Sequence, residues 1–385
     1  MAELCGIVGI GQTKLAAKRV DVSMPGLVRE AADRALTDAG LDWRDIDAVV
    51  VGKAPDTFEG CMLPELYLAD ALGAPGKPLL RVHTAGSVGG STAIVAASLI
   101  QAGIHDRVLT VAYEKQSESN AMWGLSISAP FGVAVVAGAG GFFAPLVRGY
   151  MRRSGAPDDV GIRVAVKDRL NALRNPYAHL HLADINYQMV EQSPMLWDPI
   201  RLLEACPSSD GACAMVLARE KLAKDAPTRP AWVHATAMRS EPTMFAGRDA
   251  INPEAGKQAA RDLYAKAGIT DPRREIDCAE IYVPFSWFEP MWMENLGFAP
   301  EGSGWRMTVE GATALDGDLP VNMSGGVLSS NPIGASGMLR FAEAAMQVRG
   351  QAGEHQIAGA RRALGHAYGG GSQYFSMWIV GSEKP

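Results

Sequence analysis

The chain has 385 residues, 48% of them hydrophobic and 20% charged, which is typical of a folded globular protein large enough for two domains. Thirty-six basic and 42 acidic side chains give a net charge of −6, which argues against a protein that binds a nucleic-acid backbone, because such proteins need clustered Lys and Arg. The five cysteines are scattered, so we expect no disulfide framework, and no apolar run reaches the roughly 20 residues of a membrane span. We therefore expect a cytoplasmic protein without a signal peptide.

The chain contains an internal duplication. In its first part AADRALTDAGL is followed by DWRDIDAVVVGKAP, and in its second part AARDLYAKAGI is followed by TDPRREIDCAEIYVPF. Each copy has the pattern of an amphipathic helix, a glycine stop, a polar turn, Ile-Asp and an apolar strand. Ile46-Asp47 and Ile276-Asp277 therefore mark equivalent points of the two copies.

Two further pairs of segments extend the duplication. LLRVHTAGSVGGSTAIVAASLIQAG matches LPVNMSGGVLSSNPIGASGMLRFAEAAMQ, and GACAMVLARE matches QYFSMWIVGSE. Val82 is thus equivalent to Val321, and Met215 to Met377. A long stretch of the first copy, rich in Pro, Met and Trp, has no counterpart in the second. We therefore predict an N-terminal half (1–115 and 206–225), an inserted loop domain (116–205) and a C-terminal half (226–385).

The alternation of strands and helices predicts an α/β fold with a parallel or mixed sheet. The helix after each glycine-rich elbow consists of small and apolar residues on every face, which is typical of a buried helix. We expect these two helices to lie between the sheets of the two halves, in five layers (αβαβα) related by a pseudo-twofold axis. A tandem of independent domains is the weaker alternative, because neither copy alone covers its elbow helix.

The two elbows, Thr84 to Gly90 and Ser324 to Gly337, place two helix N-termini near the pseudo-twofold axis. Free backbone N–H groups and the helix dipole at such ends suit a developing oxyanion, and glycine allows close approach of a substrate. The candidate residues for this role are Gly86, Ser87, Gly325, Gly326, Gly334 and Gly370. The alternative interpretation is that these glycines serve tight helix–sheet packing alone.

Tyr282 ends an apolar strand of the second copy where the first copy has Gly52. A phenol at a position where the symmetry is broken is a candidate acid–base group. Its ordinary pKa near 10 must be lowered for it to act as a base at neutral pH. The alternative is a core tyrosine whose hydroxyl bonds to the backbone.

The duplicated halves, NMSGGVLSSNPIGASG and the closing GHAYGGGS together resemble the thiolase superfamily, and in particular its sterol-carrier-type, lipid-transfer branch. The resemblance covers nearly the whole chain. It implies a thiolase fold, an acyl-CoA substrate with no cofactor other than this coenzyme A, a homodimer, and for several members a small DUF35-type partner protein. No metal site is expected, since neither Cys206 and Cys213 nor His179 and His181 have a suitable spacing.

The chain departs from the thiolase pattern at each catalytic motif. Gly86 stands where thiolases carry the nucleophilic Cys. Their Asn-Glu-Ala-Phe, Gly-His-Pro and Cys-x-Gly motifs correspond to 282–285, 330–332 and 367–369, which read Tyr-Val-Pro-Phe, Ser-Asn-Pro and Ala-Tyr-Gly. Glycine cannot form the acyl-thioester through which thiolysis proceeds. None of the cysteines lies at an elbow, so one reaching the site from elsewhere is the less favoured alternative.

The resemblance to thiolase-like steroid side-chain aldolases, which lack the nucleophile and carry a tyrosine where Tyr282 stands, implies retro-aldol cleavage of a β-hydroxyacyl-CoA. Tyr282 would be the general base, and Asn331 would donate to the thioester carbonyl where those aldolases have a second tyrosine. His83, His366 or Tyr368 would then supply the proton, although each is also explained by a structural role. Met122, Trp123, Phe285 and Tyr368 are expected to shape the acyl pocket.

Two other functions remain open at this point. One is an acyltransferase with an unusual nucleophile, either Ser87 or a cysteine. The other is a non-catalytic lipid carrier or partner subunit. Trp123, Trp287, Met291 and Trp292 either supply apolar surface for a dimer or a partner, or form core.

Overall fold

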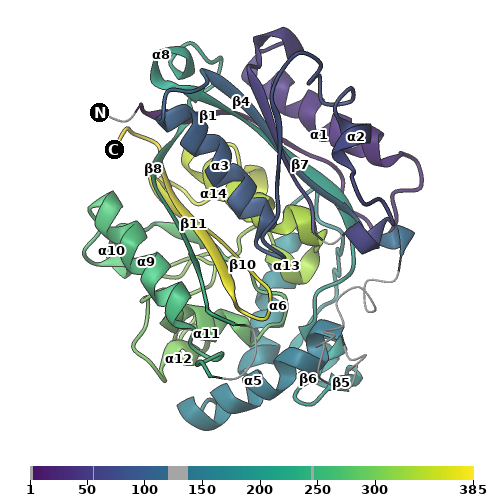
Figure 1. Ribbon diagram of the computed structural model, residues 1–385. Coiled ribbons are helices and arrows are strands. Elements are labelled where there is room, and N and C mark those ends of the chain that lie inside the picture. The colour runs from purple at the N-terminus through teal and green to yellow at the C-terminus, as the bar shows by residue number, and fades with distance from the viewer. Residues whose placement is uncertain (1–2, 55, 120–137, 244–246) are drawn as a thin grey trace.

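The computed structural model describes residues 3–54, 56–119, 138–243 and 247–385 (Figure 1). Its described residues form one large mixed sheet in the order β3-β2-β4-β7-β1-β8-β11-β10-β9, and a small sheet of β5 and β6. The strands are β1 (Cys5–Gln12), β2 (Ala48–Gly52), β3 (Leu79–Val82), β4 (Arg107–Lys115), β5 (Met195–Trp197), β6 (Ile200–Arg201), β7 (Asp210–Arg219), β8 (Ala231–Ser240), β9 (Cys278–Glu280), β10 (Arg362–Gly369) and β11 (Tyr374–Gly381). This sheet confirms the predicted α/β class.

The two halves of the large sheet have matching topology. In the first half β2 pairs in parallel with β3 and β4, and β4 pairs antiparallel with β7. In the second half β9 pairs in parallel with β10, which pairs antiparallel with β11, and Val321 bridges Ala279 in parallel at the position equivalent to β3. The equivalences Val82 with Val321 and Met215 with Met377 therefore fall on matching strands, as predicted.

The helix ends and the Ile-Asp motifs repeat in detail. Helices α1 (Met24–Ala39) and α9 (Glu254–Ala267) both end on a left-handed glycine with φ of 65°. Asp47 Oδ2 then accepts from the backbone N–H groups at 106 and 107, at 3.0 and 2.8 Å. Asp277 Oδ2 accepts from those at 361 and 362, both at 2.8 Å. Each aspartate thus ties the start of one parallel strand to the start of its neighbour.

Five layers follow from how the helices cover the sheet. Helix α1 packs on β1, β4 and β7, and α9 packs on β8 and β11, so these two helices form the outer layers. The elbow helices α3 (Val88–Gln101) and α14 (Ile333–Arg349) pack on each other and on both halves of the sheet, and almost every residue of α14 is buried. The predicted five-layer arrangement is confirmed.

Small residues allow α3 and α14 to cross closely. A Cβ built on Gly89 would lie 2.4 Å from the backbone nitrogen of Met338, and one built on Gly337 would lie 2.8 Å from that of Gly90. Any side chain at these two positions would push the central helices apart.

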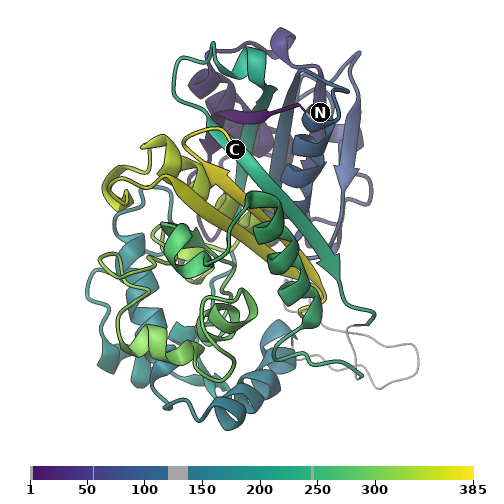
Figure 2. The ribbon, with the colours of Figure 1, turned by 90° about the vertical axis from the view of Figure 1, so that its left-hand side faces the viewer.

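The two β layers are joined at their edges, which the sequence did not indicate. Strand β1 pairs antiparallel with β8 through Gly6 with Trp232 and Ile7 with Ala231, so the nine strands are continuous. Strand β1, near the start of the chain, and strand β11, near its end, both pair with β8 at this join (Figures 1 and 2).

The remaining helices are mostly short. They are α2 (Glu65–Leu68), α5 (Gly138–Ser154), α6 (Val160–Ala172), α7 (Tyr187–Glu191), α8 (Glu220–Ala223), α10 (Pro272–Glu275), α11 (Phe288–Asn295), α12 (Gly304–Val309) and α13 (Gly326–Ser329). Helices α2 and α8 lie on the first half, and the others lie around the second half or within the segment between β4 and β7. In Figure 1, α5, β5 and β6 lie at the end of the molecule away from α1. The domain boundaries at 115/116 and 205/206 stay a prediction.

The aromatic–methionine cluster of the second half is core. Trp287, Met291 and Trp292 are at most 1% exposed. Helix α11 packs on α12, the Trp292 ring packs on Phe375 of β11, and Trp292 Nε1 donates to Tyr282 O at 2.9 Å. These three side chains therefore offer no surface to a dimer or a partner. Trp123 lies outside the described residues.

Candidate active site

Tyr282 and Asn331 meet at the carboxyl end of the parallel strands of the second half. Tyr282 follows β9 by two residues, and Asn331 precedes α14 by two. The Tyr282 hydroxyl donates to Asn331 Oδ1 at 3.2 Å, and both side chains are more than nine-tenths buried. The structure thus brings together the two residues expected to act as base and thioester donor.

Ser336 and Cys206 complete the hydrogen bonding of Asn331. The Ser336 hydroxyl donates to Asn331 Oδ1 at 2.8 Å, and Asn331 Nδ2 donates to Cys206 Sγ at 3.1 Å. The Asn331 amide oxygen therefore accepts hydrogen bonds from two hydroxyls, those of Tyr282 and Ser336, and one of the amide N–H groups donates to the Cys206 thiol. No partner for its second N–H is found among the described residues.

Cys206 was not expected at the site, but the fold places it there. Residues 205 and 285 form a β-bridge, and Cys206 N donates to Pro284 O at 2.9 Å. Buried Arg169, on α6, donates to Leu203 O and Ala205 O at 3.0–3.1 Å and fixes the same segment. No sequence spacing indicates this contact, because it depends on how the segment after β6 folds back on residue 284.

We expect Cys206 to react slowly with alkylating reagents at neutral pH. Burial raises the pKa of its thiol to about 11, although the Asn331 amide and Arg169 act in the opposite direction. The thiolate is the nucleophile, so the rate of carbamidomethylation of Cys206 by iodoacetamide should rise about tenfold per pH unit from pH 7 to 10. Peptide mass analysis measures it, with urea-unfolded protein as the control. A rate that levels off below about pH 9 in the folded protein would contradict this assignment.

An aromatic wall surrounds the Tyr282 phenol. The Tyr368 ring meets the Tyr282 ring edge-on at 5.3 Å between centroids, and it also contacts Phe288, at 5.5 Å. Phe285 packs on Phe288 and on Phe143 of α5. The predicted pocket residues Phe285 and Tyr368 therefore lie beside the site, while Met122 and Trp123 lie outside the described residues. Phe143 belongs to the inserted segment that was expected to shape the pocket. Phe288 was not predicted, since it looks like any core phenylalanine in the sequence.

The surroundings keep the phenols neutral in the chain by itself. Burial, as the largest cause, raises the pKa of Tyr282 and that of Tyr368 well above the usual value for tyrosine. The Ser336 hydroxyl and the charge of Arg340 act in the opposite direction on Tyr282. A base role for Tyr282 therefore requires further stabilisation of the phenolate when substrate is bound.

The two predicted histidines occupy different environments. His366 is fully buried, its Nδ1 accepts from Tyr282 N at 3.3 Å, and burial lowers its pKa to about 3, so the ring is neutral and holds the backbone of Tyr282. His83 is partly exposed, and burial, followed by the charge of Arg81, lowers its pKa. No hydrogen bond among the described residues joins His83 to Tyr282 or Asn331.

The first elbow holds Gly86 close to the end of β10. A Cβ at Gly86 would lie 3.2 Å from Tyr368 O, so its backbone faces the strand that carries the aromatic wall. Ser87 is fully buried, and its hydroxyl donates to Thr84 O at 2.8 Å. With its hydroxyl committed to the backbone, Ser87 is poorly placed to act as a nucleophile.

The other predicted glycines make packing or turn contacts. Gly325, with φ of 85°, lies against Ala172 of α6, where a Cβ would come within 2.4 Å of the alanine Cβ. A Cβ on Gly334 would lie 2.2 Å from Tyr113 O, so this glycine lets α14 approach β4. Gly326 and Gly370 have φ of 58° and 61°, which favours glycine. Their roles toward an oxyanion stay a prediction.

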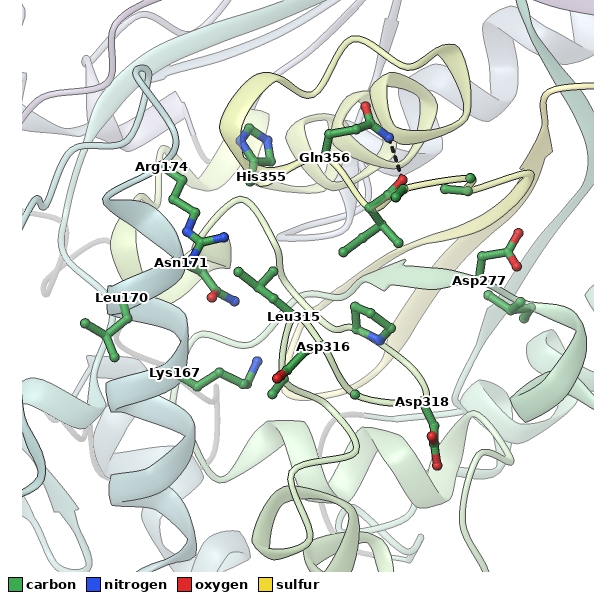
Figure 3. A pocket seen from close by; sticks show the side chains of 18 of the residues that line it. Lys167, Leu170, Asn171, Arg174, Asp277, Leu315, Asp316, Asp318, His355 and Gln356 are labelled. Atoms are coloured by element: carbon green, nitrogen blue, oxygen red, sulfur yellow. Dashed lines mark hydrogen bonds between the residues drawn. The ribbon is translucent and has the colours of Figure 1, made fainter.

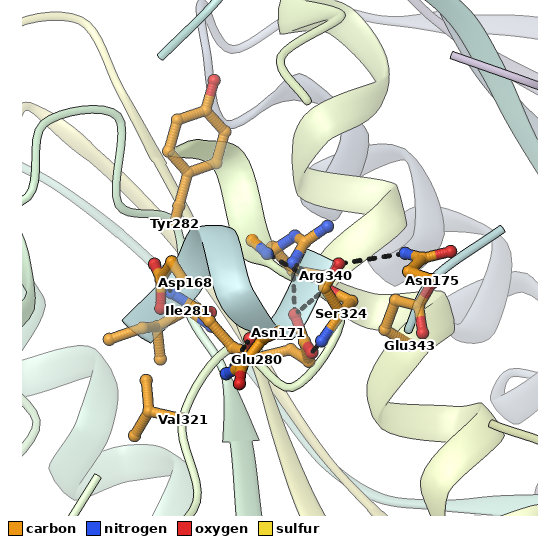
Figure 4. Close-up of polar contacts among 12 residues, drawn as sticks. Asp168, Asn171, Asn175, Glu280, Ile281, Tyr282, Val321, Ser324, Arg340 and Glu343 are labelled. Atoms are coloured by element: carbon orange, nitrogen blue, oxygen red, sulfur yellow. Dashed lines mark hydrogen bonds and ion pairs between the residues drawn. The ribbon is translucent and has the colours of Figure 1, made fainter. Parts of the chain in front are cut away.

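A buried polar network lies behind Tyr282 (Figure 4). Glu280, at the end of β9, forms an ion pair with Arg340 of α14, and both are at most 3% exposed. Ser324 N donates to Glu280 Oε1 at 2.9 Å, and Asn322 Oδ1 accepts from Ile281 N at 2.8 Å. The Tyr282 side chain points away from this network, which therefore fixes the backbone that carries the phenol without contacting the phenol oxygen.

A large open cleft of about 1510 Å³ lies beside α6 (Figure 3). Lys167 and Asn171 of α6 line it, together with Arg174 just after the helix, and the opposite wall is made by 314–318 and 355–360. Residues 276 and 277, just before β9, also line it, so it lies at the amino ends of the parallel strands. None of the predicted site residues lines this cleft.

Within the described part of the chain, no group of three or more His, Cys, Asp or Glu side chains is arranged to hold a metal ion. No helix in those ranges is both long and apolar enough to cross a membrane.

Comparison with known proteins identifies the family. The family described as Thiolase C-terminal domain-like matches residues 237–382. An acetyl-CoA acetyltransferase of Methanothermobacter thermautotrophicus is 31% identical over 381 residues, which cover 94% of this chain and 96% of that protein. The chain belongs to the thiolase superfamily.

Two similar proteins are named as a lyase and as an aldolase. The 17-hydroxy-3-oxo-4-pregnene-20-carboxyl-CoA lyase of Mycobacterium tuberculosis is 30% identical over 93% of this chain and 94% of that protein. The solved structure of an Ltp2-ChsH2(DUF35) aldolase is similar with a TM-score of 0.84, at 27% identity, and covers 99% of this chain and 98% of that one. Both the acyltransferase and the lyase chemistry of the superfamily are therefore represented among the similar proteins.

Proposed function

We propose that the protein is a lyase that cleaves a β-hydroxyacyl-CoA by a retro-aldol reaction, without an acyl-enzyme. The observation that carries this proposal is the pairing of a glycine at the nucleophile position, Gly86, with a buried phenol, Tyr282, whose hydroxyl contacts Asn331. The chain keeps the fold of enzymes that act on CoA thioesters. At the first elbow, however, Gly86 replaces the cysteine whose thiol would form a thioester with the acyl group.

The reaction requires one base and one set of oxyanion donors. The Tyr282 phenolate removes the proton of the β-hydroxyl, the oxygen electrons form the new carbonyl, and the bond between the α- and β-carbons breaks. The electron pair of that bond passes to the α-carbon and the thioester oxygen as an enolate, which is then protonated to give the shorter acyl-CoA. The second N–H of Asn331 donates to the thioester oxygen, where negative charge develops.

The proton for the enolate has two candidate sources. Tyr282 holds the abstracted proton and can return it. Tyr368 carries a neutral phenol 5.3 Å away between ring centroids. His366 is a weaker candidate, because its Nδ1 is occupied by the backbone N–H of Tyr282 and its ring is fully buried.

The aromatic wall supports a bulky apolar acyl group. Phe143, Phe285 and Phe288 with Tyr368 form a continuous set of ring contacts next to the phenol. Such a wall fits a steroid-like or other large hydrophobic side chain, in line with the name of the mycobacterial lyase. CoA enters this proposal as part of the substrate.

We propose two protein contacts on the basis of the family and the surface. A small DUF35-type partner is proposed because the similar aldolase structure contains one.

A homodimer through the β3 edge is proposed because large apolar side chains gather there on the surface. Five of them are more than two-fifths exposed: Met62, Leu63, Leu66, Tyr67 and Leu80. An unpaired parallel edge next to an apolar patch is a surface that a second copy can extend.

An acyltransferase that uses Cys206 as the nucleophile is the second candidate. Cys206 is the cysteine that the fold brings to Asn331, and the archaeal acetyltransferase is 31% identical to the chain. The raised pKa of the thiol counts against it, because no general base adjacent to Sγ is found among the described residues.

A product assay tests the proposal. Purified protein, alone and with a DUF35-type partner, is incubated with a β-hydroxyacyl-CoA that carries a tertiary or secondary β-hydroxyl on a bulky group. The lyase proposal predicts equal amounts of the ketone or aldehyde and the CoA ester of the shorter acid. Tight binding of the acyl-CoA with no product in either reaction would contradict it and favour a carrier or partner subunit.

A further inference from the structure

Ser336 occupies a position from which it can reach both members of the site. It lies in the first turn of α14, is fully buried, and its hydroxyl donates to Asn331 Oδ1 at 2.8 Å. Its hydroxyl also lies 3.1 Å from Pro332 O, and it neighbours the Tyr282 hydroxyl, because both hydroxyls donate to the same oxygen, Asn331 Oδ1. A hydroxyl can rotate to donate to any one of these oxygens.

Loss of the phenol proton changes what Tyr282 needs from its neighbours. While neutral, the phenol donates to Asn331 Oδ1. A phenolate cannot donate, and it would then face an amide oxygen across a buried contact, which is repulsive. The ionised oxygen needs a donor in place of this acceptor, and hydrogen bonds to charged groups are about twice as strong as those between neutral groups.

We propose that Ser336 is the hydrogen-bond donor that stabilises the Tyr282 phenolate, the form that acts as the base. In this ionised form of Tyr282, the Ser336 hydroxyl turns from Asn331 Oδ1 to the phenolate oxygen. This assignment rests on the proposed lyase function, and it adds to it the residue that makes the base available.

The other groups around Tyr282 favour this role for α14. Arg340, one turn further along the same helix, favours the phenolate through its charge, although it is paired with Glu280. The positive end of the helix dipole acts in the same direction. On the other sides, Glu114 of β4 and Cys206 disfavour it, and Tyr368 of β10 is a neutral phenol. Helix α14 therefore supplies the groups that favour ionisation, and the Ser336 hydroxyl is the one that shares Asn331 Oδ1 with the phenol.

Kinetics of Ser336 variants test the proposal. Ser336→Ala should lower kcat at neutral pH about tenfold, with recovery toward higher pH and KM changed less than about twofold, and Ser336→Thr should restore most of the loss. Ser98→Ala is the matched control, because Ser98 on α3 also donates to the carbonyl four residues earlier, at 2.8 Å, but lies outside the site. A kcat–pH profile of Ser336→Ala that coincides with that of the unmodified protein would overturn the proposal.

A second measurement does not depend on turnover. Tyr282 is replaced by 3,5-difluorotyrosine, whose phenol is more acidic, and its ionisation is followed by fluorine NMR in the presence and absence of Ser336→Ala. The midpoint should lie about one pH unit higher when Ser336 is Ala. Such a shift in a protein that cleaves no β-hydroxyacyl-CoA upholds the contact with the phenolate and contradicts the lyase function. An unchanged midpoint overturns the role of Ser336, whatever the activity.

Discussion

Tyr282→Phe should lower the turnover of a β-hydroxyacyl-CoA by about 10²–10⁴-fold, the range that a general base contributes. The variant removes the oxygen that accepts the β-hydroxyl proton and leaves the ring, which is 4% exposed and packed edge-on against Tyr368. The fold should be kept, because the hydroxyl makes a single neutral hydrogen bond, to Asn331. KM for the acyl-CoA should change much less than kcat.

The control for this variant is Tyr264→Phe. Tyr264 is also buried, and its hydroxyl donates to Leu296 O at 2.8 Å, far from the site. Loss of that hydroxyl should leave turnover unchanged.

Because burial raises the pKa of Tyr282, a phenolate base also predicts that kcat/KM rises with pH through the neutral and alkaline range, and that this rise is absent from the residual activity of Tyr282→Phe. Full activity in Tyr282→Phe would exclude the phenol as the base.

Glu280→Gln should destabilise the protein by about 3–5 kcal/mol, because it leaves the buried Arg340 guanidinium without its counter-charge. Glu280 and Arg340 are 0% and 3% exposed, so water cannot replace the lost carboxylate. The glutamate also accepts from Ser324 N and Ser324 Oγ, both at 2.9 Å, and thus holds the second elbow. Urea unfolding followed by circular dichroism measures the loss.

A surface pair provides the comparison for Glu280→Gln. Arg239 and Asp262 form an ion pair with side chains 50% and 36% exposed, and Asp262→Asn should cost less than about 1 kcal/mol. The double variant Glu280→Leu with Arg340→Met should recover much of the stability, since it removes both buried charges. A loss below about 1 kcal/mol for Glu280→Gln would show that this ion pair does not hold β9 and α14 together.

The sequence allowed the fold to be predicted because both copies keep the same local signals. The glycine stops at 40 and 268 and the aspartates at 47 and 277 have the same conformations and bonds in the two halves. The join between β1 and β8 was not predicted, because strand pairing at an edge leaves no periodic signal.

The site was predicted in part. Tyr282 and Asn331 could be found because they replace motif residues, and the structure places them in contact. Cys206 could not be found, because it reaches the site through long-range packing of the segment between β4 and β7. Phe288 could not be found either, because nothing in the sequence separates it from other core phenylalanines. The surface interpretation of Trp287 and its neighbours was wrong, because apolar residues on a short helix give no indication of what covers them.

Intact-protein mass analysis of a reacting mixture tests the central claim most directly. The protein is quenched in acid during turnover of a β-hydroxyacyl-CoA, and the protein mass and the small-molecule products are measured in the same sample. Carbon–carbon cleavage without an acyl-enzyme predicts an unmodified protein mass together with ketone or aldehyde and shortened acyl-CoA. A stable acyl adduct that disappears in Cys206→Ala, with the products of acyl transfer, would contradict it.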